Sequence, residues 1–106
     1  MYKEVRSSVR FPLQLPVQVR WKAPGGKYRQ AEGKTGNISG NGVFLTLPAR
    51  IRLATLIVFR VVLPTEITKT PVVLVGQGRV VRRNREPSGV AAVIEDYRLM
   101  PLRRKA

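Results

Sequence analysis

The chain has 106 residues, enough for one small domain with a single core. Twenty Lys and Arg stand against six Asp and Glu, giving a formal net charge of +14, and fourteen of the cations are arginine. Because Cys and His are both absent, the sequence excludes disulfides, thiol chemistry, the usual zinc ligand sets and imidazole catalysis. No carboxylate dyad, Walker loop or dinucleotide-binding glycine motif is present. We therefore expect a protein that binds an anionic partner, and not an enzyme.

The chain also has no segment suited to a membrane. Its longest apolar runs, such as Leu56–Phe59 and Val90–Ile94, are far shorter than the roughly 18 residues that a spanning helix needs. Residues 1–10 are charged and have no apolar centre, so they resemble neither a signal peptide nor a transit helix. We expect a cytoplasmic protein without membrane insertion.

Six stretches have the composition of strands. Val17, Val19 and Trp21 alternate with polar residues, which is the period-two pattern of a half-buried strand. Asn41-Gly42 is a two-residue hairpin signal, and Gly76 and Gly78 are candidate bulge sites where a strand bends. The predicted strands are 16–22, 28–38, 43–47, 53–63, 72–83 and 90–94, with turns at 24–26 and 87–89 and a loop at 65–70. This spacing predicts an all-β, six-stranded antiparallel barrel.

We expect one domain over residues 1–106, since no repeat, low-complexity block or linker divides it. The barrel is predicted over 13–95, preceded by a flexible arginine-bearing loop over 1–12. Asp96 could cap a final helix, but Pro101 would end it after about one turn. Residues 96–106 are therefore predicted to be a short helical or frayed tail.

Two short motifs are the most informative features. The first is Arg6-Ser7-Ser8-Val9-Arg10, and the second is Asn37-Ile38-Ser39-Gly40-Asn41-Gly42. A chain with this many arginines contains about two pairs at i, i+4 by chance, and it has two, Arg6/Arg10 and Arg79/Arg83. The second motif fixes three residue types and is far less common by chance, although a hairpin turn alone could explain Asn41 and Gly42.

Together the two motifs resemble the bacterial PilZ family, whose pattern is RxxxR in an N-terminal loop followed by D/NxSxxG on a six-stranded barrel. The resemblance covers nearly the whole chain. It implies a receptor for cyclic di-GMP that needs no other cofactor and signals to a downstream protein. It implies binding by Arg6, Arg10, Asn37, Ser39 and Gly42. The family's closing strand often has glycine where this chain has Ala91.

The chemistry of these residue types suits that ligand. An arginine fork can grip guanine O6 and N7 or a phosphate, and its plane can stack on a base. Asn37 can donate to and accept from a guanine edge, Ser39 can bond an oxygen, and Gly42 lets the backbone approach. Closure of the N-terminal loop over the ligand would couple binding to a conformational change.

In the family, the residue before the arginine pair resembles a selector of stoichiometry. An arginine there tends to hold a stacked ligand dimer, whereas an apolar residue tends to leave room for one ligand. This chain has Val5 at that position, so the resemblance implies one ligand per chain.

Two alternatives stay open. The +14 charge also fits a small basic barrel that binds RNA or DNA. However, single-strand binders present exposed aromatics for stacking, and Trp21, Phe44 and Phe59 fit buried strand positions, so no stable nucleic-acid complex is expected. The second alternative is a PilZ-like protein interaction module that has lost its ligand.

Overall fold

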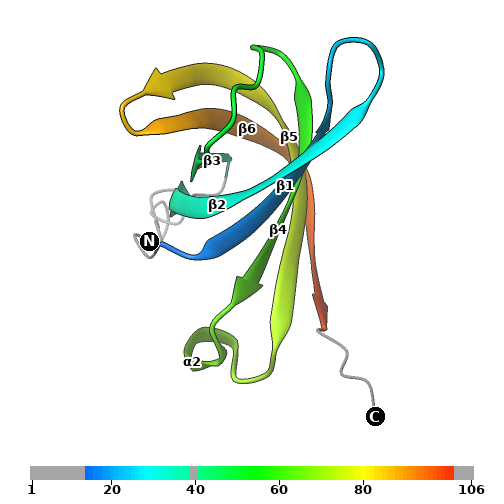
Figure 1. Ribbon diagram of the computed structural model, residues 1–106. Coiled ribbons are helices and arrows are strands. Elements are labelled where there is room, and N and C mark those ends of the chain that lie inside the picture. The colour runs from blue at the N-terminus through cyan, green and yellow to red at the C-terminus, as the bar shows by residue number, and fades with distance from the viewer. Residues whose placement is uncertain (1–13, 39–40, 102–106) are drawn as a thin grey trace.

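The protein is a closed barrel of six antiparallel strands, as the sequence predicts (Figure 1). A computed structural model describes residues 14–38 and 41–101. The strands follow around the barrel in the order β1-β2-β3-β6-β5-β4, and β4 pairs with β1 to close it. The elements are β1 (Pro16–Lys22), β2 (Tyr28–Ile38), β3 (Gly42–Thr46), β4 (Leu56–Leu63), α2 (Thr65–Thr68), β5 (Val72–Arg85) and β6 (Ser88–Pro101).

The core lies inside the barrel and is built by the period-two alternation of the strands. Val17, Val19 and Trp21 point inward from β1 and are buried, as their spacing predicts. Phe59 on β4 is fully buried, and a Cβ built on Gly76 would lie 2.5 Å from its Cζ. Position 76 must therefore remain glycine for the aromatic ring to fit between β4 and β5. A bulge lies opposite Gly78, although its extra residue is Glu95 of β6 and not a residue of β5, since Gln77 pairs with Asp96 and Gly78 with Ile94.

The connection between β2 and β3 differs from the predicted two-residue hairpin at Asn41-Gly42. Ile38, the last residue of β2, pairs with Val43, and Gly42 already belongs to β3, so three residues, 39–41, connect the two strands. A bulge in β2 between Thr35 and Asn37 shifts the register of the pair by one residue, so that Ile38 faces Val43. Gly42 is held in the sheet by its pairing with Val93 of β6.

Two strand limits in the middle of the chain also differ from the prediction. The strand expected from residue 53 begins at Leu56, because Ala54 has a left-handed backbone with φ of 69° that a strand cannot include. The loop expected over 65–70 contains the one-turn helix α2, whose C-cap residue Lys69 is also left-handed.

The C-terminal part of the barrel corrects the prediction of a tail that starts at Asp96. The described residues from Asp96 to Pro101 continue β6 and pair with β5, from Gln77 back to Val72. A one-turn helix has too few hydrogen bonds to compete with a complete ladder, and proline is tolerated at the end of a strand.

At its opposite end, the β5–β6 hairpin extends past the barrel. β4 pairs with β5 only as far as Arg79, and β3 pairs with β6 only from Gly89 onward. Residues 81–88 therefore form a two-stranded arm, visible as the yellow and orange hairpin in Figure 1. Its turn contains a cis peptide bond between Glu86 and Pro87. Within residues 14–38 and 41–101, no helix is long and apolar enough to cross a membrane.

Candidate ligand-binding site

The structure brings together the two predicted site residues that it describes. Asn37 is exposed near the end of β2, and Gly42 is the first residue of the neighbouring strand β3. Both therefore lie at the same end of this strand pair. Arg6, Arg10 and Ser39, and the stoichiometry position Val5, lie outside the described residues.

The register of the barrel extends this motif across two further strands. Asn37 pairs with Phe44 on β3, Phe44 pairs with Ala91 on β6, and Ala91 pairs with Arg82 on β5. These four residues form one row, and Gly42 pairs with Val93 in the same region. Neighbouring strands are about 4.8 Å apart. A flat ligand that contacts Asn37 on β2 would therefore extend over β3 and then β6.

Phe44 is the aromatic side chain nearest to Asn37 along this row, and it corrects a prediction. We expected a buried strand position, but Phe44 is half-buried, on the opposite face of β3 from the buried Val43 and Leu45. Glycines leave space for its ring: a Cβ on Gly36 would lie 2.6 Å from Phe44 Cδ2, and one on Gly89 would lie 3.2 Å from its Cζ. The outer face beside Asn37 therefore carries an aromatic ring packed over two glycines.

Thr35 fixes the point at which the N-terminal segment enters the barrel. Its backbone N–H donates to Leu15 O at 2.9 Å, and its Oγ1 accepts from the Leu15 N–H at 3.0 Å. Thr35 is fully buried, so these two bonds satisfy polar groups of both residues away from water. These bonds hold Leu15 against Thr35, which is two residues before Asn37 on β2.

The backbone beside Gly42 is held from the β6 side. The Ile94 N–H donates to Asn41 O at 3.0 Å, and Val93 pairs with Gly42. This fixes the last two residues of the second motif against the barrel.

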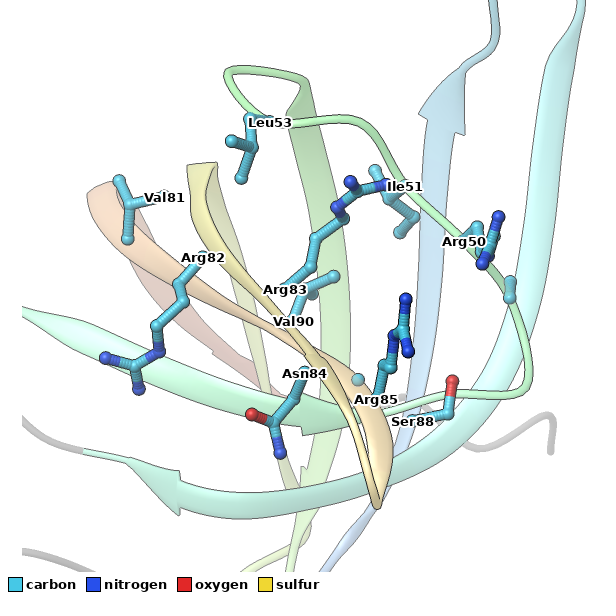
Figure 2. Close-up of a pocket in the computed structure, with 12 residues that line it drawn as sticks. Arg50, Ile51, Leu53, Val81, Arg82, Arg83, Asn84, Arg85, Ser88 and Val90 are labelled. Atoms are coloured by element: carbon cyan, nitrogen blue, oxygen red, sulfur yellow. The ribbon is translucent and has the colours of Figure 1, made fainter.

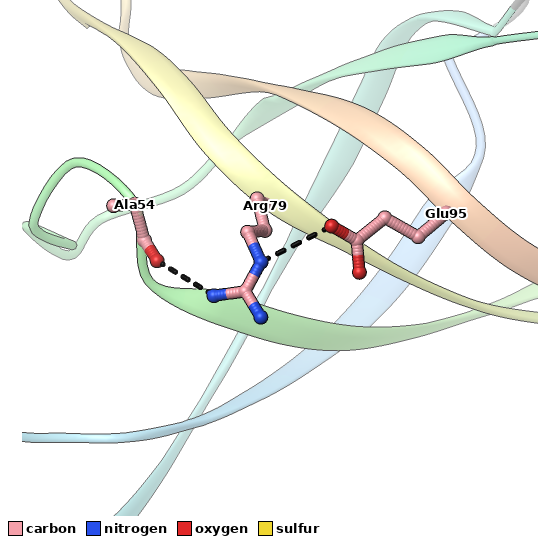
Figure 3. A network of polar contacts seen from close by, with 3 residues as sticks. All are labelled: Ala54, Arg79 and Glu95. Carbon is pink, nitrogen blue, oxygen red and sulfur yellow. Dashed lines mark hydrogen bonds and ion pairs between the residues drawn. The ribbon is translucent and has the colours of Figure 1, made fainter.

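Arg79, the first member of the other i, i+4 arginine pair, has partners of its own (Figure 3). Its Nε donates to Glu95 Oε2 at 3.1 Å, and its Nη1 donates to Ala54 O at 3.2 Å. Arg79 therefore ties β5 to β6 and to the loop before β4.

Sequence reasoning missed Thr35 and Arg82 as neighbours of the motif. The bulge beside Thr35 breaks the alternation that would have marked its inward position. Arg82 is placed opposite Ala91 by a second bulge, between Val80 and Arg82, which no local pattern reveals. Within the described parts of the chain, no three His, Cys, Asp or Glu side chains gather as a metal site.

The comparisons with known proteins agree with this geometry. The sequence model of the PilZ domain matches residues 4–98, which include both motifs and all six strands nearly to the end of β6. The chain belongs to the PilZ domain family. PilZ domains are generally receptors for cyclic di-GMP, and they are ligand-binding or adaptor modules rather than enzymes.

A solved structure supports the same assignment. The crystal structure of the PilZ domain of CeSA from a cellulose-synthesizing bacterium is similar to this chain, with 25% sequence identity and a TM-score of 0.59. The match covers 84% of this chain and 83% of that one. No curated protein sequence matches the chain.

Proposed function

We propose that this PilZ domain is a cyclic di-GMP receptor that binds its ligand through Arg6, Arg10, Asn37, Ser39 and Gly42. The observation that carries the proposal is the complete pair of motifs within a family match over residues 4–98. Asn37 and Gly42 lie at one end of the β2–β3 pair, where an amide side chain and an accessible backbone can meet a guanine edge.

The anchor at Leu15 supports the role of the arginine loop. Leu15 is five positions after Arg10, so the chain between their Cα atoms spans at most about 18 Å. Thr35, which bonds Leu15, is two residues from Asn37, or about 7 Å along a strand. Arg10 can therefore reach a ligand that contacts Asn37. Arg6, four residues earlier in the chain, can reach the same ligand.

The surface between these residues suits a flat anionic ligand. Phe44 offers an aromatic ring beside Asn37, and guanidinium forks from the loop could grip a guanine or a phosphate from the other side. Arg82 ends the same row on β5 and adds positive charge at the far edge. Such a ligand would be enclosed between the barrel and the N-terminal loop.

Ordering of residues 1–10 over the ligand is the proposed output. A segment rich in charges and poor in apolar anchors gains most of its order from the ligand itself. The surface that it then presents would be read by a downstream protein.

The proposal is tested by recording backbone amide spectra of the full chain during a titration with cyclic di-GMP. The expected shifts are at Asn37, Gly42 and residues 1–10, with order parameters of residues 1–10 rising on binding, while Lys22 and Tyr28, at the opposite end of the β1–β2 pair, stay unchanged. Shifts confined to the β5–β6 arm, or equal shifts with a short RNA, would overturn it in favour of a charge-driven nucleic-acid binder.

A further inference from the structure

The arm of the β5–β6 hairpin carries an open strand edge. β5 pairs with β4 only from Val72 to Arg79, and one further exchange joins Val80 to the loop before β4. Within the described residues, no strand pairs with the outer edge of Val81–Arg85. Every second residue of such an edge presents its N–H and C=O outward, ready to pair with an added strand.

A groove of about 470 Å³ lies between this part of the hairpin and the loop before β4 (Figure 2), and Ser88, Gly89 and Val90 of β6 also line it. One wall is the β5 arm, and the other is the loop from Ala49 to Leu53. Figure 2 shows Arg83 and Arg85 pointing toward the loop side, while Arg82 and Asn84 point to the opposite side of β5. The bulge at Val80 and Arg82 bends the arm and opens this space.

Exposed guanidinium groups line the groove. Arg50 from the loop and Arg83 and Arg85 from the arm are exposed, and none forms an ion pair or side-chain hydrogen bond within the described residues. Arg50 and Arg83 also line an adjoining pocket that adds Arg52. Exposed Leu53 and Val81 complete the rim with aliphatic surface.

The loop wall is built before any partner arrives. Leu47 and Ile51 are buried in the core at 1% exposure each. The Leu47 N–H donates to Ser88 O at 3.0 Å, and the Ala54 N–H donates to Val80 O at 2.7 Å. Both ends of the loop are thus tied to the β5–β6 hairpin, so a bound segment would not have to order this wall.

We infer that this groove, here called the arginine groove and formed by residues 49–53 and 81–85, binds an extended acidic peptide segment of another protein as an added strand. Main-chain hydrogen bonds to the open edge of β5 would supply the pairing. Arg50, Arg83 and Arg85 would accept its carboxylates as charge-assisted forks. Leu53 and Val81 would contact its apolar side chains.

Other occupants fit the groove less well. A second copy of this chain would place its own arginine-bearing edge against this one, and like charges on an edge repel. Single-stranded nucleic acid needs exposed aromatic platforms, and the only aromatic residue lining either pocket, Trp21, is 6% exposed. An acidic strand would pair with both the edge and the cations that have no partner among the described residues.

The inference deepens the proposed function, since it rests on a receptor that signals to a partner and names the chemistry of that partner. The two sites are joined by β3, which begins at Gly42 and ends at Thr46, three positions before the loop wall begins at Ala49. Arg82 lies at the border of both surfaces, but Arg6, Arg10, Asn37, Ser39 and Gly42 are outside the groove, so Arg50 and Arg83 can be changed without altering these five residues.

The test uses a fluorescein-labelled Glu-Val-Glu-Val-Glu-Val-Glu peptide and the full chain, with binding followed by fluorescence anisotropy at physiological salt. Saturable binding with amide shifts at residues 81–85 and 49–53 is expected. The double variant Arg50→Gln/Arg83→Gln should weaken binding at least about tenfold. Arg20→Gln removes an equally exposed cation from β1 outside the groove and should change the affinity less than about twofold.

A peptide with every Val replaced by Pro keeps the charge but removes strand pairing, so it should bind at least about tenfold more weakly. Equal affinity for the Pro peptide, or tighter binding of a uridine oligonucleotide of equal charge through the same arginines, would overturn the inference. The variant Arg6→Ala/Arg10→Ala separates the two proposals. It should lose cyclic di-GMP and retain the peptide, and loss of both from a folded variant would contradict the separate groove.

Discussion

The two ends of β3 present different kinds of surface. At the first end, Gly42 belongs to a contiguous sequence motif that begins at Asn37 near the end of β2 and ends at the first residue of β3. At the second end, the chain enters the arginine groove, where Arg50 meets Arg83 and Arg85 from a distant hairpin. The residues of the first surface are close together in the sequence, whereas those of the second are distant in the sequence and are brought together only by the fold. Local motifs therefore reveal only one of the two candidate sites.

The largest effect that separates the two ends is expected from the arginine loop. Arg6→Ala or Arg10→Ala should cost about 1–3 kcal/mol of cyclic di-GMP binding, because each removes a charge-assisted fork. Arg83→Ala, in the arginine groove, should change this binding little. Isothermal titration of the three variants checks the comparison, and an equal loss from Arg83→Ala would show that the ligand occupies the groove.

The next effect concerns Thr35, which lies opposite Leu45 in the middle of β3. Thr35→Val keeps the shape but removes the acceptor for the buried Leu15 N–H, which should cost about 1–3 kcal/mol of stability. Urea denaturation of the variant measures this cost. Thr46→Val, on the outer face of β3, is the matched control and should remain within about 0.5 kcal/mol of the native protein. A Thr35→Val variant as stable as the control would refute the anchor.

A smaller effect is expected at Arg79. Its ion pair with Glu95 is exposed, at 52% and 41% for the two side chains, and such pairs contribute about 0–1 kcal/mol. Arg79→Ala should therefore lower the stability slightly and leave cyclic di-GMP affinity within about twofold. Denaturation and titration of the same variant test both statements. An affinity loss as large as that of Arg10→Ala would reassign the functional arginine pair to β5.

The smallest effect on affinity is expected at position 5, where a substitution should instead change the number of ligands bound per chain. Val5 is expected to leave room for one cyclic di-GMP per chain, since an isopropyl group adds neither stacking area nor charge for a second ligand. Val5→Arg should raise the number bound toward two. Titration end points measure this directly, and saturation of the native chain at two ligands would reject the selector role of Val5 without affecting the receptor assignment.

Much of the fold could be predicted because strand alternation and turn residues are local. Val17, Val19 and Trp21 correctly predicted the inward face of β1, and Gly78 marked the position of a bulge, although the extra residue is in β6. The errors arose where pairing with a distant strand decided the outcome. Pairing with β5 keeps the residues from Asp96 to Pro101 in β6. The bulge after Thr35 shifts the register between β2 and β3. Both depend on cross-strand register, which the sequence does not reveal locally.

The candidate site follows the same rule. Asn37 and Gly42 could be predicted from their motif, and they lie at one end of neighbouring strands. The half-buried Phe44 beside Asn37 and the position of Arg82 opposite Ala91 follow from bulges and glycine contacts that only the assembled barrel defines.

The most direct test of the central claim is calorimetric titration of the full chain with cyclic di-GMP at an ionic strength of about 0.15 M, where nonspecific attraction to the +14 surface is screened. The account predicts saturable binding with a dissociation constant of about 10 μM or below, and no comparable binding of GMP, ATP or a short RNA. No heat with cyclic di-GMP at about 1 mM, or equal binding of all four ligands, would contradict the receptor assignment.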